Sequence, residues 1–432
     1  MPSALSATRA FFPLDEELQL LPGQLTPRLQ EMVVRLATWM PFARAAQEVE
    51  WFTQVTVSEA LARRLTEKAG ATQVALQTAE VEHLERTTPE PPAGPAVQMV
   101  SVDGAMVPLL HGEWGEVKTL VIGTVQPPVL ERGEKVVHTT ELSYFSRLTD
   151  AETFGRLATV ETQRRGVERA GCVCAVTDGA VWEQGFVDLH CPTAVRILDF
   201  SHAMEHLALA GQVVHGEATP AFYRWLQDTA HELKHGSPDA VLAQLETLYT
   251  EQVQTGNSRA TVILEQHAYL AKRRAHIAYA EFQAQGYPIG SGAVESGNKL
   301  VVEVRLKGAG MHWARTHVNP LLALRNLVCN DRWDEAWSSI DQSQRDTARR
   351  VRRARQQEHR LKQSAVCALP QRSGEEKPSL RQRTDTARAV PQPAPQRNPT
   401  GRAHRPADDH PWRHSPIGRA RFKPYRKPSA KL

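Results

Sequence analysis

Two short phrases in the sequence place an aspartate and a glycine between apolar residues. They are "VSVDGAMVPL" at 100–109, which contains Asp103, and "AVTDGAVW" at 175–182, which contains Asp178. An Asp-Gly pair between apolar flanks favours a tight β-hairpin turn, and this is the better explanation for each acid taken singly. An acid carried to a buried strand could instead do chemistry. The local pattern leaves both interpretations open.

Two later acids change the balance between these interpretations. Asp199 ends the apolar run "AVRILD" and is followed by His202, whereas Glu295 lies at the start of a predicted helix behind a glycine-rich turn. Acids at the ends of buried strands and in a first helical turn are poorly explained by core packing. Asp199 competes with Asp178 for the place of second acid, because both follow a strand. The residue types alone do not separate the two.

The chemistry that a set such as Asp103, Asp178 and Glu295 would support is metal-dependent phosphoryl transfer. Two bare carboxylates about 4 Å apart repel by roughly 4 kcal/mol at an effective dielectric constant near 20. Two Mg²⁺ ions, or Mn²⁺, would remove that cost, since hard cations prefer carboxylate oxygens. Such a pair of ions clamps the attacking and leaving oxygens of an in-line displacement at phosphorus. No side-chain nucleophile is then needed, and we find no P-loop, G-x-S-x-G or G-x-G-x-x-G arrangement.

The charge distribution points to a polyanionic partner. The chain of 432 residues has a net charge of +4, but residues 341–432 hold 23 Lys and Arg against 8 Asp and Glu. The tail is therefore strongly basic and the body is acidic, a pattern typical of nucleic-acid-binding proteins. A solvated tail without a partner is the alternative. Because this segment is also rich in Gln and Pro, we expect it to be largely disordered.

Other features bound the class of protein. The 5 cysteines form neither a disulfide framework nor a zinc-finger spacing, so we expect reduced thiols in a cytoplasm. The amino terminus shows no apolar signal region, and no apolar stretch reaches membrane-spanning length. The sequence thus predicts a soluble protein that has no membrane partner.

The chain divides into segments of different pattern. Residues 1–86 are predicted to form a helical domain, which a proline-rich linker at 87–96 separates from the rest. Residues 97–214 read as three strands, a helix and two further strands, typical of a mixed α/β layer with a central sheet. We expect a helical insertion at 215–285, a return to the α/β unit with an acidic helix at 286–340, and the basic tail at 341–432.

The N-terminal helices resemble a DNA-binding motif. Two helical pieces flank a β-branched turn, and Ser58 is placed to cap the second piece, which carries Arg63, Arg64 and Lys68. This pattern suits a helix-turn-helix whose second helix enters a major groove. An ordinary helical hairpin with a solvated basic face explains the pattern about equally well.

Longer blocks around the acids carry a resemblance to a known family. The blocks "VSVDGA", "AVTDGAVW", "ILDFSHAMEHL" and "PIGSGAVESGNKLVVEVRLKGAGMHW" look like the signatures of bacterial insertion-sequence DDE transposases of the ISKra type. This group belongs to the Mutator-like branch, and the resemblance covers roughly residues 10–335. It implies an RNase H-like catalytic domain whose helical insertion precedes the last acidic helix.

The resemblance also implies a role for each acid. Asp103, Asp178 and Glu295 would be the first, second and third catalytic acids and the metal ligands. Asp199 and His202 match the D-x-x-H element of such enzymes, an auxiliary element thought to shape the site, although His202 is about as well explained as a hydrogen-bonding residue at a helix start. The basic residues near the last acid that could meet DNA phosphates are Lys299, Arg305 and Lys307.

The expected function is therefore a transposase that binds the terminal inverted repeats of its insertion sequence and catalyses Mg²⁺-dependent strand cleavage and strand transfer. Double-stranded DNA would be its partner, at least a homodimer would act on the two ends, and the location would be the nucleoid in a bacterial cytoplasm. Two alternatives remain: a transposase-derived regulator that binds DNA without catalysis, and a structure-selective RNase H-like nuclease.

Overall fold

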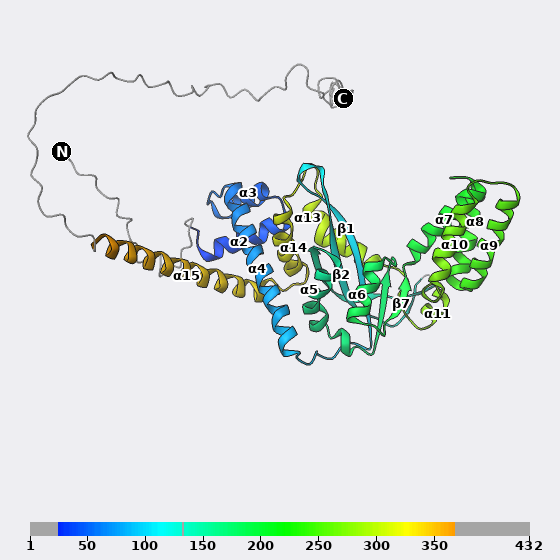
Figure 1. The fold of residues 1–432 in the computed structure, drawn as a ribbon, viewed down its shortest axis with the longest axis horizontal. Coiled ribbons are helices and arrows are strands. Elements are labelled where there is room, and N and C mark those ends of the chain that lie inside the picture. The colour runs from blue at the N-terminus through cyan, green and yellow to red at the C-terminus, as the bar shows by residue number, and fades with distance from the viewer. Residues whose placement is uncertain (1–24, 132–133, 368–432) are drawn as a thin grey trace, which may run out of the picture. The chain divides into compact units, whose positions relative to one another are not determined.

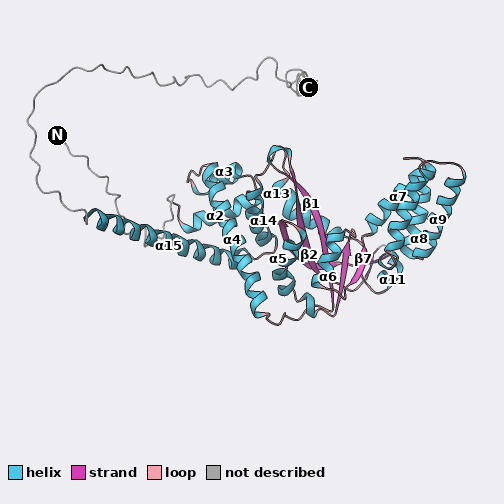
Figure 2. Cartoon of the chain, in the orientation of Figure 1, coloured by secondary structure: helices cyan, strands magenta, loops and turns pink. Residues whose placement is uncertain are grey.

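The structure is a computed structural model and describes residues 25–131 and 134–367 (Figure 1). Its centre is a mixed α/β unit built on one five-stranded sheet of order β5-β2-β1-β6-β7 (Figure 2). The strands are β1 (Val97–Pro108), β2 (Trp114–Val125), β5 (Thr139–Leu148), β6 (Cys172–Thr177) and β7 (Val195–Leu198). The first three strands form an antiparallel meander, and β6 and β7 continue the sheet parallel to β1. The strand β3 (Val129–Glu131) pairs with β4 (Glu134–Val136) in a separate ribbon.

Helices cover both faces of the sheet because its central strands alternate apolar residues to both sides. In β1, Val100 and Val102 face a core with α5 (Ala151–Arg164) and α6 (Val181–His190). Met99 and Val107 face the opposite core, which includes the acidic helix. That helix consists of α12 (Gly292–Gly297), the π-helical turn η4 (Asn298–Glu303) and α13 (Val304–Leu306). A strand buried on both sides must be apolar on both sides, so polar residues within β1 need a separate explanation.

Neither Asp-Gly pair forms a hairpin turn. Strand β1 runs straight through Asp103 and Gly104, which lie opposite Thr119 and Lys118 of β2. The chain reverses only at η1 (Leu110–Gly112), where His111 and Gly112 have positive φ. Asp178 directly follows β6 and leads into α6. The hairpin interpretation is therefore wrong at both places, because the residues after Asp103 continue β1 and those after Asp178 lead into α6.

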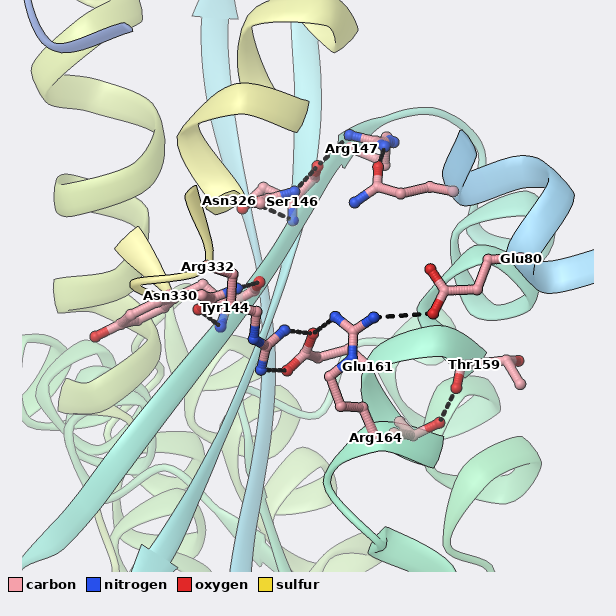
Figure 3. Close-up of polar contacts among 12 residues, drawn as sticks. Glu80, Tyr144, Ser146, Arg147, Thr159, Glu161, Arg164, Asn326, Asn330 and Arg332 are labelled. Atoms are coloured by element: carbon pink, nitrogen blue, oxygen red, sulfur yellow. Dashed lines mark hydrogen bonds and ion pairs between the residues drawn. The ribbon is translucent and has the colours of Figure 1, made fainter. Parts of the chain in front are cut away.

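The exposed edge of β5 is covered by asparagine side chains from α14 (Arg315–Cys329). The amide of Asn326 accepts from Ser146 N–H at 3.1 Å and donates to Ser146 C=O at 3.3 Å (Figure 3). Asn330, just after the helix, makes the same pair of bonds with Tyr144, and Asn319 makes it with Leu148. Alternate residues of an edge strand direct both backbone groups outward. The three amides thus occupy the place of a sixth strand and block edge-to-edge pairing.

We expect Asn326→Ala to lower the free energy of unfolding by about 2–3 kcal/mol, measured by chemical denaturation. The substitution leaves the buried Ser146 N–H and C=O unpaired, which costs more than the gain in helix propensity. Asn326 is 2 % exposed, so water does not replace the lost partner without rearrangement. Thr316→Ala, at an exposed position of the same helix, is the matched control and should change stability by less than about 0.5 kcal/mol. Equal effects at the two positions would contradict this role of the asparagine.

The N-terminal helices are α2 (Pro27–Trp39), α3 (Phe42–Thr53) and α4 (Glu59–Thr87). Ser58 caps α4 as the sequence predicts, since its hydroxyl accepts from Leu61 N–H at 3.2 Å. Helix α4 packs against α14 so closely that a Cβ on Gly70 would lie 2.1 Å from Pro320 C=O. The contact between the two helices therefore requires glycine at position 70.

Helices make up the segment between the sheet and the acidic helix. They are α7 (Phe200–His215), α8 (Pro220–His235), α9 (Pro238–Gln254), α10 (Ala260–Lys272), η3 (Arg274–His276) and α11 (Tyr279–Ala284). Thr219 caps α8 by accepting from Phe222 N–H, and Ser237 caps α9 by accepting from Asp239 N–H. A further short turn, η2 (Val167–Arg169), precedes β6.

The carboxyl-terminal helix corrects one expectation. Helix α15 (Trp333–Cys367) covers the first part of the basic segment, so the prediction of disorder from residue 341 onward is wrong for 341–367. Long side chains such as those of Arg and Gln favour helix, which explains why a polar segment can form one. Residues 1–24 and 368–432, including the rest of the predicted tail, lie outside the described residues. Among the described helices none combines the length and apolarity needed to cross a membrane.

Candidate metal centre

Two of the predicted acids meet because their strands are neighbours in the sheet. Strands β1 and β6 are parallel, and Val100 lies opposite Ala175. Extending that register by three residues places Asp103 opposite Asp178. Asp103 still lies within β1, and Asp178 follows the last residue of β6. Parallel strands bring their carboxyl ends to one edge of a sheet, which is where sites of such folds form.

A third carboxyl group, which the sequence analysis did not single out, joins them. Ligand oxygens of Asp103, Asp178 and Glu183 all lie within 4.8 Å of one another. Glu183 belongs to the first turn of α6 and is 1 % exposed. Its Oε2 accepts from Gly179 N–H at 3.1 Å and from Ala180 N–H at 3.2 Å, so it also fixes the loop that holds Asp178.

The environment opposes charge on two of these carboxyl groups. Burial raises the pKa of Glu183 to about 10, with further contributions from its hydrogen bond to Asp178 and from the charges of Asp178 and Asp103. The pKa of Asp103 is also raised, mainly by burial and further by the charges of Asp178 and Glu295. Hydrogen bonds from Gly104 N–H at 2.6 Å and from the Asn298 amide at 2.8 Å oppose that shift. The protein groups around the three carboxyl groups therefore do not fully compensate the negative charge that the groups would carry if all were ionised.

Glu295 lies beside this cluster on α12. It is exposed, and its Oε1 lies 3.5 Å from the Ser291 hydroxyl. Its charge acts on the pKa of Asp103, so the two carboxylates are electrostatic neighbours. Glu295 is not one of the three residues whose ligand atoms lie within 4.8 Å of one another. The structure therefore brings Asp103 and Asp178 together and adds Glu183, with Glu295 on the adjoining helix.

Asp199 has a structural task at the edge of this site. Its Oδ2 accepts from His202 N–H at 2.8 Å and caps α7, while its Oδ1 accepts from Ser291 N–H at 2.7 Å. Asp199 is 4 % exposed, and both of its oxygens are engaged by backbone donors. It therefore ties the end of β7 to the start of α12. Asp178, rather than Asp199, shares the cluster with Asp103.

We expect Asp199→Ala to lower the free energy of unfolding by about 2–4 kcal/mol, because it removes a helix cap and a second charged acceptor. Asp199→Asn keeps one acceptor oxygen, so its free energy of unfolding should lie between those of Asp199→Ala and the wild type. The control is Asp188→Asn, whose side chain is 67 % exposed and pairs with Arg196. Chemical denaturation in the absence of metal measures all three. A loss no larger than that of the control would show that the two backbone bonds are dispensable.

The helices of residues 200–285 supply a support for the loop that carries Asp178. The Tyr269 hydroxyl donates to Asp178 C=O at 2.8 Å, and Arg273 donates to Gly179 C=O at 2.9 Å. The Arg273 guanidinium lies 3.7 Å from the Tyr269 ring centroid. On the other face of that ring system, His206 stacks on Tyr269 with centroids 3.8 Å apart. His202 contacts His206, with Nε2 atoms 3.3 Å apart, which places it in this network near the site.

The predicted DNA-binding residues fall into two groups. Those at the surface are Arg63, Arg64 and Lys68 on α4, Lys299 on η4, and Lys307, which pairs with Glu303 at 2.7 Å. Arg305 is instead 1 % exposed, so its predicted contact with DNA is wrong. Its Nε donates to Ala37 C=O at 3.0 Å, and its guanidinium packs over Phe42 and Trp313. It is buried because the N-terminal helices dock on this part of the chain.

A second buried arginine, Arg325, also joins the N-terminal helices to the acidic helix. Arg325 donates to Val301 C=O at 3.2 Å and to Leu300 C=O, which are carbonyl groups of the π-helical turn. It also donates to Thr38 C=O at 3.3 Å, at the end of α2. A π-turn leaves carbonyls out of the regular i, i−4 pattern, so these need other donors. The N-terminal helices and the acidic helix are therefore joined through buried charge.

Glu183 and Asn298 were not predicted as site residues, although the sequence around each contains a local signal. Glu183 lies five positions after Asp178, where an acid in a first helical turn can bond the preceding loop. Asn298 lies three positions after Glu295, so a helix places both on one face. Tyr269 and Arg273 had no such signal, because only the packing of α10 brings them to the loop.

The donor set fits a divalent cation. Its oxygens belong to carboxyl groups, which Mg²⁺ and Mn²⁺ prefer, and they converge from β1, the end of β6 and α6. Cation binding would supply the positive charge that the cluster lacks and would release the proton held by Glu183. No protein-family model matches this sequence, and a search of curated proteins finds no match.

Proposed function

We propose that the chain is a DDE transposase of the ISKra type that cleaves and joins DNA strands with divalent cations held by Asp103, Asp178 and a third acid. The observation that carries the proposal is the convergence of Asp103 and Asp178 from neighbouring parallel strands. The strand order β5-β2-β1-β6-β7, with an antiparallel meander beside two parallel strands, supports an RNase H-like catalytic domain. The signature blocks around the acids supply the assignment to this family.

Each part of the site has a task in this proposal. When bound, two divalent ions supply the charge that activates the attacking oxygen and stabilises the leaving oxygen. Asp103 and Asp178 hold and orient that charge, and either Glu183 or Glu295 provides the third carboxylate. Lys299, exposed one turn after Glu295, has no partner among the described residues and is placed to meet a phosphate.

The remaining surfaces fit a DNA partner. Arg63, Arg64 and Lys68 lie exposed along α4, as a major-groove helix requires. The described part of the basic carboxyl-terminal segment is helical, and Arg349, Arg350 and Arg353 are exposed on it. Phosphate neutralisation by such residues would make DNA affinity fall steeply with salt. We propose a homodimer or higher oligomer on the two element ends, acting at the bacterial nucleoid.

The test is a cleavage and joining assay on DNA that contains the sequence flanking the gene. Mg²⁺-dependent nicking followed by joining to a second duplex supports a transposase, and Asp103→Ala serves as the inactive control. Nicking without joining would replace the proposal by a structure-selective nuclease. Binding that is specific but never followed by a metal-dependent cut would replace it by a DNA-binding regulator.

A further inference from the structure

Asn298 holds an unusual position at the acidic cluster. It begins the π-helical turn that continues α12, with helical φ and ψ, and lies three residues after Glu295. Its side chain is directed at the carboxyl groups, because Nδ2 donates to Asp103 Oδ2 at 2.8 Å. The residue is 5 % exposed. A buried amide is thus in direct contact with one of the oxygens of the cluster.

The other half of that amide has no hydrogen bond. Asn298 Oδ1 is buried and finds no donor among the described residues. A buried acceptor without a donor costs about 1–3 kcal/mol, and such groups are uncommon in folded proteins. An amide oxygen next to carboxylates is also the kind of group that divalent cations use as a ligand. No hydrogen bond from the described residues holds Oδ1 in its present place, so the amide can turn this oxygen toward a cation bound at the cluster.

We propose that Asn298 is an oxygen ligand of the divalent cation at this centre. Without metal the amide donates from Nδ2 and partly compensates the charge of Asp103. With metal, the cation takes over that compensation, and rotation of the amide about Cβ–Cγ exchanges Nδ2 for Oδ1. The inference rests on the proposed function for the presence of a cation, and it assigns this residue beyond the three acids.

The experiment uses a change in metal preference and needs neither DNA nor activity. In the full-length protein, Asn298→Cys replaces a hard oxygen by a soft sulfur, which binds Cd²⁺ well and Mg²⁺ poorly. We expect affinity for Cd²⁺ to rise about 10-fold or more and affinity for Mg²⁺ to fall several-fold, measured by calorimetry and by the metal-induced shift in Tm. Ser296→Cys adds a thiol to an exposed position of the same helix and is the matched control.

The outcomes separate the possible roles. A ratio of Cd²⁺ to Mg²⁺ affinity in Asn298→Cys equal to that of the control overturns the inference, and leaves Asn298 as a residue that positions Asp103. If Asn298→Cys does not fold, Asn298→Asp serves instead, since a carboxylate ligand should preserve or strengthen Mg²⁺ binding. Weakening of Mg²⁺ binding by Asn298→Asp as large as that by Asn298→Ala overturns the inference as well.

The same measurements distinguish failure of this inference from failure of the proposed function. Cation binding with the expected shift in preference, but without any DNA cleavage, contradicts only the proposed function. Cation binding and cleavage without the shift contradict only the role of Asn298. A wild-type protein that binds neither Mg²⁺ nor Mn²⁺ contradicts both.

Discussion

Replacing Asp103 by asparagine should lower the rate of Mg²⁺-dependent DNA cleavage by about 10³-fold or more. The carboxylate is central to the cluster, and charge stabilisation at a metal site contributes several kcal/mol to the transition state. The same substitution should raise the stability of the metal-free protein by on the order of 1 kcal/mol, because burial and, to a smaller extent, the charges of Asp178 and Glu295 raise the pKa of Asp103 in the folded state. Loss of activity together with a gain in stability is the signature of a functional site.

Cleavage of a supercoiled plasmid and thermal unfolding in a chelator measure the two effects. Glu113→Gln is the control, since its side chain is 65 % exposed and lies beyond the end of β1. It should leave cleavage unchanged. If Asp103→Asn cleaves as fast as the wild type, then the cluster is not where the chemistry occurs. If it loses stability, the carboxylate has a structural rather than a catalytic task.

Replacing Glu183 by glutamine should change how stability depends on pH. The pKa of Glu183 is about 10 in the folded protein against an ordinary value of 4.5. Between these values the unfolded chain is ionised and the folded chain keeps the proton, so the folded state binds more protons. Stability is therefore lost as pH rises through this window, and the loss is absent below it. Glutamine is neutral throughout and can still donate a hydrogen bond to Asp178.

The variant should consequently be more stable than the wild type by about 2 kcal/mol or more near pH 9, and nearly equal to it near pH 4. Excess Mg²⁺ should raise the Tm of the wild type more at high pH, where the proton of Glu183 is released more easily. Glu183→Gln should gain less from Mg²⁺ at every pH. Glu205→Gln, with a side chain that is 74 % exposed, is the control for a simple loss of charge.

The result for Glu183 also decides which acid is the third ligand. If Glu183→Gln binds Mg²⁺ as tightly as the wild type, Glu183 only braces the Asp178 loop, and Glu295 completes the centre. The resemblance implies Glu295, whereas the separation of ligand atoms groups Glu183 with the two aspartates. Calorimetric titration of both Glu→Gln variants with Mg²⁺ separates these assignments.

Local patterns determined a large part of the architecture. Alternating apolar residues predict the strands that carry Asp103 and precede Asp178, and the structure has both as β1 and β6. The predicted mixed α/β class is also confirmed, with a mixed five-stranded sheet and many helices. Ser58 caps the helix that the sequence predicts it to begin. These features depend on neighbours within four residues, so they can be read from the chain directly.

Other features depended on how the elements pack. The Asp-Gly pair at 103 is a strong hairpin signal, but both of its residues pair with β2, which keeps them within a strand. Arginine is usually a surface residue, yet the side chain of Arg305 is buried against the rings of Phe42 and Trp313. Nothing in the helical sequence around residues 319–330 predicts a contact with a strand. The side chains that complete the edge of β5 are nevertheless those of Asn319, Asn326 and Asn330.

The sequence by itself therefore determined many of the strands and helices, including the strands that carry Asp103 and precede Asp178. Only the tertiary structure decided which acid accompanies Asp103 and Asp178, why Asp199 is a cap, and where Asn298 directs its amide. The physical reason is that helix and strand signals act over a few residues. The meeting of Asp103 with Asn298 depends instead on strand register and helix docking across 195 positions of the chain.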